Sequence, residues 1–69
     1  MDEAKAFGNR LRSVMTERGL IPLTLASNLG IPEHELNKYL KGEILPNEDL
    51  LGRMASTLHV PIAHLRGNV

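Results

Sequence analysis

One short stretch of the chain carries side chains that form hydrogen bonds in different ways. Lys38 is a donor, Glu33 is an acceptor, and Asn37 can act as either. His34 can also donate or accept, and Lys41 adds a further positive charge. Such a set could recognise a polar partner. The alternative is that these residues simply cover the solvent-facing side of a helix.

No comparable arrangement points to catalysis or to a metal. The chain has no cysteine, so it has no thiolate nucleophile, no thiolate ligand and no disulfide. His59 and His64 are five residues apart, which does not place them on one face of a helix. The serines have no histidine and carboxylate at a supporting spacing. We therefore expect no enzyme, cofactor or metal, and the lack of cysteine fits a reduced, cytoplasmic setting.

The 69 residues predict one all-α domain that covers residues 1–69. Apolar residues make up 42% of the chain, which is enough for a small core. No apolar run approaches the roughly 18 residues of a membrane span, so no membrane partner is expected. Apolar residues recur at helical spacing, as in Phe7, Leu11 and Val14, and no strand is expected. The predicted helices cover about residues 3–18, 22–29, 32–41, 48–58 and 61–65.

Residues that start and stop helices bring the second and third predicted helices close together in the sequence. Gly30 follows the last apolar position of the second helix, where a left-handed residue is preferred. Pro32 suits the first turn of the third. Farther on, Asn47 is a good N-cap, and His59 takes a position where glycine is expected. Two short helices separated by about four residues that include a glycine are typical of a helix-turn-helix.

Apolar and glycine positions along most of the chain carry a resemblance to a known family. They are Leu11, Gly19, Leu25, Ala26, Leu29, Gly30, Ile31, Leu36, Gly42, Pro46, Leu50, Leu51, Ala55, Leu58, Val60 and Leu65. On these residues the chain resembles the Cro/cI-type helix-turn-helix family, the lambda-repressor-like domains, from Phe7 to Gly67. The resemblance implies a compact five-helix DNA-binding domain whose third helix enters the major groove.

The resemblance also implies which residues would touch DNA. Its base-reading positions fall on Glu33, His34, Asn37 and Lys38. Lys38 could donate to guanine and Glu33 could accept from cytosine. Lys41 would hold a phosphate, or would only be a cation at the negative end of the helix dipole. Three arginines of the first helix could supply further positive charge or could form a solvated face: Arg10, Arg12 and Arg18.

A protein of this kind would regulate transcription as a repressor or an activator in a bacterium, phage or plasmid. The resemblance implies a homodimer on a palindromic double-stranded operator, with half-sites about one helical turn apart. We expect a dimer surface near the last helix, with Ile44, Ile62 and Val69 as its apolar residues. The alternative is that these three residues complete the core.

Several residues depart from the family pattern in ways that weaken DNA binding. Ile21 and Pro22 replace the Ser or Thr and the Gln that usually begin the second helix. Glu43 stands where Lys or Arg is common, and eight basic residues are cancelled by eight acidic ones. A basic face is the usual electrostatic footprint of a DNA-binding protein. The alternative function is therefore a protein-interaction module on the same fold, antirepressor-like or antitoxin-like, with reduced or lost DNA affinity.

One departure changes two positions together. Many members pair an Arg late in the first helix with a Glu late in the third, and the matching positions here are Met15 and Leu40. Replacing both charges by apolar residues is often neutral or stabilising, whereas losing one partner leaves an unpaired buried charge. We therefore expect Met15 and Leu40 to be buried and in contact.

Overall fold

Five α-helices make up the computed structural model, which describes residues 2–67 of the chain. They are α1 (Glu3–Arg18), α2 (Pro22–Leu29), α3 (Glu33–Leu40), α4 (Glu48–Leu58) and α5 (Ile62–Arg66). No strand occurs within these described residues, and the all-helical prediction is confirmed for them. Val69, one of the expected dimer residues, lies outside the described part of the chain.

The bounds of α3 and α5 differ slightly from the expected ones. Pro32 and Pro61 are N-cap residues with ψ of 146° and 145°, so each helix begins one residue after its proline. The pyrrolidine ring fixes φ near −65°, but ψ remains extended at both positions. At the other end of α3, Lys41 is the C-cap. The helices α1, α2 and α4 begin and end at the predicted residues.

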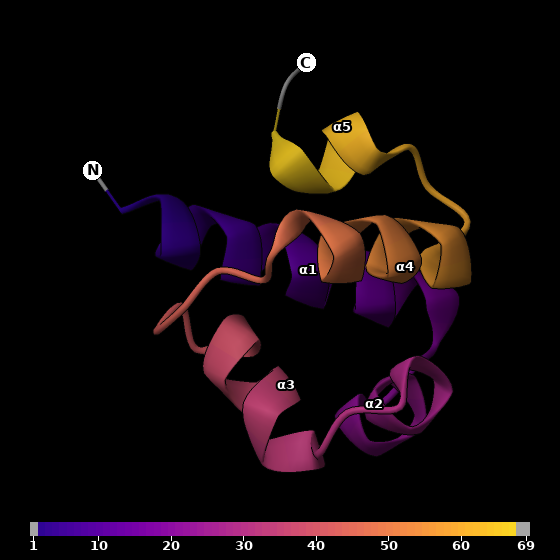
Figure 1. The fold of residues 1–69 in the computed structure, drawn as a ribbon. Helices are drawn as coiled ribbons and strands as arrows, with labels where there is room; N and C mark the ends of the chain where they lie inside the picture. Colours follow the sequence, from indigo (N-terminus) through magenta and orange to yellow (C-terminus); the bar gives the residue numbers. More distant parts are fainter. Residues whose placement is uncertain (1, 68–69) are drawn as a thin grey trace.

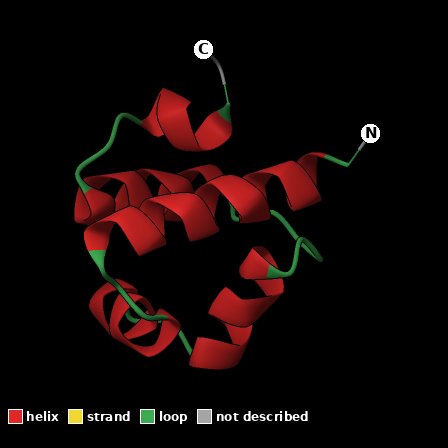
Figure 2. Cartoon of the chain, turned by 180° about the vertical axis from the view of Figure 1, so that it is seen from behind, coloured by secondary structure: helices red, strands yellow, loops and turns green. Residues whose placement is uncertain are grey.

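The helices form three levels around α1 and α4, which lie side by side (Figure 1). The helices α2 and α3 contact each other on one side of this central pair, and α5 contacts α1 and α4 on the other side. The view from behind also shows α5 on one side of the α1–α4 pair and α2 and α3 on the other (Figure 2). No helix among residues 2–67 combines the length and the apolar character needed to cross a bilayer.

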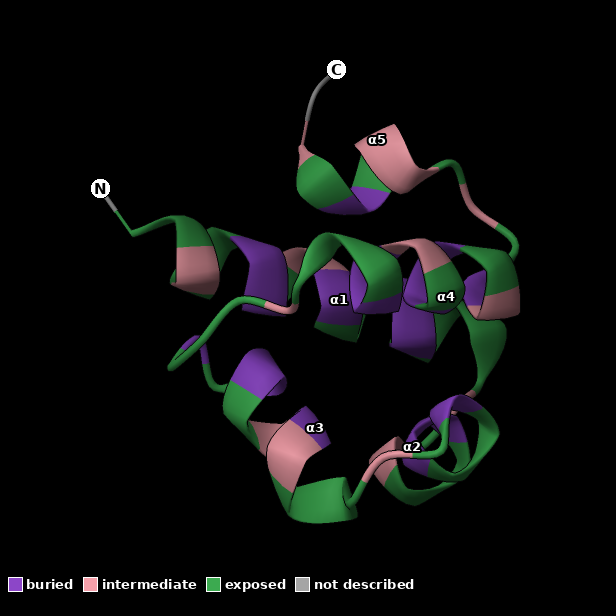
Figure 3. Cartoon of the chain, in the orientation of Figure 1, coloured by how far each residue is buried: buried purple, intermediate pink, exposed green. Residues whose placement is uncertain are grey.

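The apolar stripes predicted for the helices meet in one core (Figure 3). It contains Phe7, Leu11, Val14, Met15, Leu25, Ala26, Leu29, Leu36, Tyr39, Leu40, Leu50, Leu51, Met54, Ala55, Leu58 and Leu65. No polar or charged residue of the described part is buried in it. The burial expected for Met15 and Leu40 is confirmed, with exposed fractions of 4% and 7%. The helices α1 and α3, which carry these residues, contact each other, and a contact between the two side chains stays a prediction.

Two of the five helices begin with a side-chain cap. The Asp2 carboxylate accepts hydrogen bonds from the backbone N–H groups of Ala4 and Lys5 at 3.1 and 3.3 Å. The Asn47 side chain accepts from the N–H of Leu50 at 2.8 Å, as predicted for an N-cap. The helices α2, α3 and α5 begin at proline-containing segments without a side-chain cap. Proline geometry replaces capping there, at the cost of unpaired N–H groups.

A single non-glycine residue among the described ones, His59, has a positive φ, of 59° with ψ of 44°. The left-handed conformation costs an L-residue about 1–2 kcal/mol, and glycine avoids this cost. Replacing His59→Gly should therefore raise the free energy of unfolding by about 1 kcal/mol, because its exposed side chain loses little packing. Urea denaturation would measure the change. An equal gain for His59→Ala, which keeps the Cβ atom, would show that backbone strain is not the cause.

Candidate nucleic-acid interface

The outward side of α3 carries the side chains that were predicted to contact DNA. The exposed ones are Glu33, His34, Lys38 and the C-cap residue Lys41, and Asn37 is half-buried among them. Their spacing places them on one helical face, opposite the face that joins the core. Within residues 2–67 none of these five side chains forms a hydrogen bond or an ion pair. The whole set is therefore available to a partner.

A neighbouring carboxylate on α3 is already engaged. The Tyr39 hydroxyl donates to Oε2 of Glu35 at 2.8 Å, and Glu35 is half-buried. Burial of the phenol, and then the hydrogen bond and the charge of Glu35, raise the pKa of Tyr39 to about 12. The hydroxyl therefore stays protonated and remains a donor at neutral pH. Glu33 is the acidic group fully exposed on this helix.

The C-terminal end of α3 lies directly on α1. Gly8 is buried in α1, and a Cβ atom built on it would lie 2.7 Å from the carbonyl oxygens of both Tyr39 and Leu40. Arg12 of α1 donates from Nη2 to the same Leu40 carbonyl at 3.4 Å. This role of Gly8 was not predicted, although a glycine inside a long helical pattern is itself a sign of close packing. This approach fixes α3 relative to the rest of the molecule.

Arginines of α1 and α4 bind carbonyl groups in the last turns of α2, α3, α4 and α5. Arg53 donates to the carbonyl of Leu29, and Arg12 donates to the carbonyl of Leu40 at 3.4 Å. Arg18 donates to the carbonyl of Leu58 at 3.0 Å, and Arg10 donates to that of Leu65 at 2.8 Å. The last carbonyls of a helix have no partner within it and lie at the negative end of its dipole. A guanidinium group donates a hydrogen bond to such a carbonyl, and its positive charge interacts favourably with the negative end of the dipole.

Arg12 and Arg18 are exposed, as a solvated face requires, and Arg10 is half-buried, but all three also bind carbonyls of other helices. The helix α1 runs past the ends of α3, α4 and α5, so its arginines reach carbonyls 28 to 55 residues away in the sequence. The remaining arginine of the described chain, Arg66, pairs with Glu48. All five arginines of residues 2–67 therefore have intramolecular partners.

The lysines differ from the arginines. Lys5, Lys38 and Lys41 are exposed, and none of them forms a hydrogen bond or ion pair through its ammonium group within residues 2–67. Lys38 and Lys41 belong to α3 and its cap, and Lys5 packs against Gly42 in the turn that follows α3. The cationic side chains of the described chain that form no hydrogen bond thus lie around α3, although the net charge is zero.

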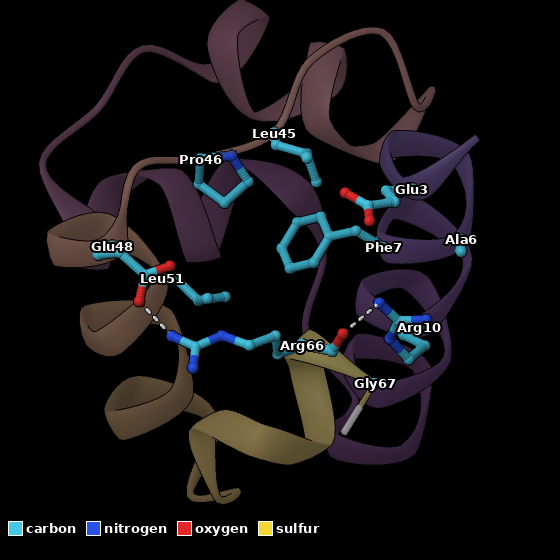
Figure 4. A pocket seen from close by; sticks show the side chains of 10 residues that line it. All are labelled: Glu3, Ala6, Phe7, Arg10, Leu45, Pro46, Glu48, Leu51, Arg66 and Gly67. Carbon is cyan, nitrogen blue, oxygen red and sulfur yellow. Dashed lines mark hydrogen bonds and ion pairs between the residues drawn. The ribbon is translucent and has the colours of Figure 1, made fainter. Parts of the chain in front are cut away.

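A hollow of about 480 Å³ lies between the first half of α1, the segment before α4 and the end of α5 (Figure 4). Phe7 and Leu51 are among its apolar lining residues. Its two cations are already used, because Arg10 donates to the backbone of α5 and Arg66 binds Glu48. The hollow therefore offers no unpaired guanidinium group to an anionic ligand.

Apolar residues expected at a dimer surface have different environments. Ile62 is half-buried and packs against the core, which is the alternative considered for it. Ile44 is 40% exposed in the α3–α4 segment, next to Leu45 at 48%. Ile21 and Leu23 at the start of α2 are 60% and 58% exposed. The exposed apolar surface is therefore at the start of α2 and after α3, and not on α5.

No match to this chain is found among protein families, characterised proteins or solved structures. Among residues 2–67, no three His, Asp or Glu side chains gather as a metal site would require. The outward face of α3 and the lysines beside it are therefore the features from which function is inferred.

Proposed function

We propose that this chain is a sequence-specific DNA-binding transcriptional regulator with a lambda-repressor-like helix-turn-helix, in which α3 enters the major groove. The observation that carries the proposal is the set of five hydrogen-bonding side chains on one face of α3, none with an intramolecular partner among residues 2–67. An α-helix fits the major groove, where each base pair presents a distinct pattern of donors and acceptors.

The connection between α2 and α3 supports this proposal. Three residues join these two eight-residue helices, and the first of them, Gly30, has φ of 73°. Its N–H bonds to Ser27, and the N–H of Ile31 bonds to Ala26, which closes the end of α2. Such a short turn between contacting helices is typical of a helix-turn-helix.

The contacts on both helices would hold the reading surface rigid. Arg53 binds the end of α2, and Arg12 and Gly8 hold the end of α3 against α1. A rigid surface loses less conformational entropy when it binds. This arrangement favours recognition by a few well-placed side chains.

The electrostatic contribution to DNA binding should be small. Each phosphate neutralised by a cation contributes about −0.9 to the slope of log K against log salt. Three available lysines would contribute about −2.7, within a predicted slope of about −2 to −4 per subunit, and binding to arbitrary duplexes should be weak. Specificity would then depend on the side chains of α3 more than on total charge.

Two substitutions on α3 test the proposal after selection of a preferred site from random duplexes at low salt. Lys38→Ala should weaken binding to that site by about 1–3 kcal/mol and relax the preference at one base pair. Glu33→Ala should strengthen binding to arbitrary duplexes, because it removes a carboxylate close to phosphates, while it blurs specificity. Fluorescence anisotropy of labelled duplexes would measure both effects.

His64→Ala provides the control, since His64 is exposed on α5, on the far side of the α1–α4 pair. It should change neither affinity nor preference. If no sequence is enriched and neither α3 variant alters binding, α3 does not read DNA.

The regulator would act as a homodimer on a palindromic operator. A single small domain covers a short half-site, and specific regulation requires more contact area. Ile44 and Leu45 are exposed apolar residues that could join two copies. Sedimentation with the selected duplex gives the stoichiometry, and one chain per duplex would contradict the dimer.

A protein-interaction module is the second candidate, and the exposed apolar residues favour it. Ile21 and Leu23 are more than half exposed, and Pro22 has no N–H to offer a phosphate at the start of α2. An antirepressor-like or antitoxin-like protein would use such a surface against another protein. It would enrich no DNA sequence in the same selection.

A further inference from the structure

We propose that Lys5 of α1 and Lys41 of α3 together bind backbone phosphates of one DNA strand at the end of the reading helix. This inference rests on the proposed DNA-binding function and adds Lys5 to it. The two lysines are 36 positions apart in the sequence, since 41 − 5 = 36. Nothing in the residue pattern places them together.

Gly42, the residue after Lys41, packs against Lys5. Its φ of 77° turns the chain away from α3, and a Cβ atom on it would lie 2.7 Å from Cα and 2.8 Å from Cγ of Lys5. The stem of Lys5 therefore passes directly over this glycine. Lys41 is the residue just before Gly42, so the backbone of Lys41 lies close to Lys5 on α1.

The backbone around both lysines is fixed. The N–H of Lys5 donates to the Asp2 carboxylate at 3.3 Å, and the N–H of Lys41 donates to the carbonyl of Asn37 at 2.9 Å. The two ammonium groups have no partner within residues 2–67. A pair of cations on a fixed backbone is suited to successive phosphates of a strand.

Nearby carboxylates could weaken phosphate binding by Lys5 and Lys41. Asp2 caps α1 and Glu3 lines the hollow of Figure 4, but Glu43 is exposed and directly follows Gly42. Its charge opposes a phosphate next to the two lysines. Glu43→Gln should therefore increase affinity for a duplex, provided that the lysines bind there.

The test measures the salt dependence of binding to a 30-base-pair random-sequence duplex by anisotropy. Lys5→Gln keeps the Cβ and Cγ atoms that pack on Gly42 and removes only the charge. It should make the slope shallower by about 0.9, which is a loss of about 3.5-fold in the ratio of affinities at 50 and 200 mM salt. The double variant with Lys41→Gln should lose about twice that slope, and Lys5→Arg should restore the wild-type value.

Ser13→Asp is the matched control. It changes the net charge by −1, as Lys5→Gln does, and Ser13 is an exposed residue of α1 beside a different hollow, which α5 also lines. Its slope should equal that of the wild type. An unchanged slope for Lys5→Gln, with Lys38→Ala still weakening the selected site, would overturn the Lys5 inference and leave DNA reading by α3 intact. A wild-type chain that binds no duplex would instead overturn the proposed function, and this inference with it.

Discussion

Leu40→Glu is expected to lower the free energy of unfolding by about 3–5 kcal/mol, one of the two largest effects predicted for this chain. Leu40 is 7% exposed in the interface of α3 with α1, and its surroundings are apolar. A carboxylate there loses most of its hydration, and the guanidinium of Arg12 on α1 already donates to the Leu40 carbonyl. Denaturation by urea, followed by circular dichroism, would measure the loss.

The second variant of this experiment adds a cation at Met15, the residue predicted to contact Leu40. Met15→Arg in the Leu40→Glu background should recover part of the lost stability, because the two charges would pair in the α1–α3 interface. Met15→Arg alone should destabilise the chain, since Met15 is 4% exposed. The double-mutant cycle isolates the coupling between the two positions. A double variant no more stable than Leu40→Glu would mean that these side chains do not meet.

Gly8→Ala should destabilise the chain by about 3 kcal/mol, because the new methyl group overlaps two carbonyl oxygens. A Cβ atom at this position would be 2.7 Å from the oxygens of Tyr39 and Leu40. Both are backbone atoms at the end of a helix, so relief requires α1 and α3 to separate. The same separation would loosen the reading surface, and DNA affinity should fall together with stability.

Gly52→Ala is the matched control within another helix. The nearest atom to a Cβ atom on Gly52 is Cδ1 of Ile62, at 3.9 Å, which is ordinary contact. Alanine is the better helix former by about 1 kcal/mol, so Gly52→Ala should stabilise the chain by about 0.5–1 kcal/mol. If Gly8→Ala lowers the free energy of unfolding and Gly52→Ala raises it, the close approach at Gly8 is the cause of the destabilisation. A neutral Gly8→Ala would contradict that approach.

Local residue patterns were sufficient to predict the helices. Helix ends follow from Asn47 and from the glycines and prolines between elements, and these act over a few residues of sequence. The buried residues follow from apolar spacing of about 3.6 residues, as in Phe7, Leu11 and Val14. The one-residue shifts at Pro32 and Pro61 arise because proline fixes φ but leaves ψ free.

The candidate site was predicted in part. The polar residues of α3 were identified through the family resemblance, and the structure places them together on one face. Their contact with DNA remains a prediction. The engagement of Glu35 by Tyr39 was not anticipated, because polarity alone does not tell a half-buried bonded carboxylate from an exposed one.

The sequence by itself determined five helices, their buried faces and a polar α3, because these depend on neighbours three or four residues apart. The tertiary structure decided which cations remain available. Arg10, Arg12 and Arg18 look like a solvated stripe in the sequence, yet each binds a carbonyl at least 28 residues away. Only the packing of α1 past the ends of other helices creates these bonds, since unpaired carbonyls and guanidinium groups have to meet in space. The same packing sets Lys5 against Gly42, the residue after Lys41, and no spacing along the chain encodes that contact.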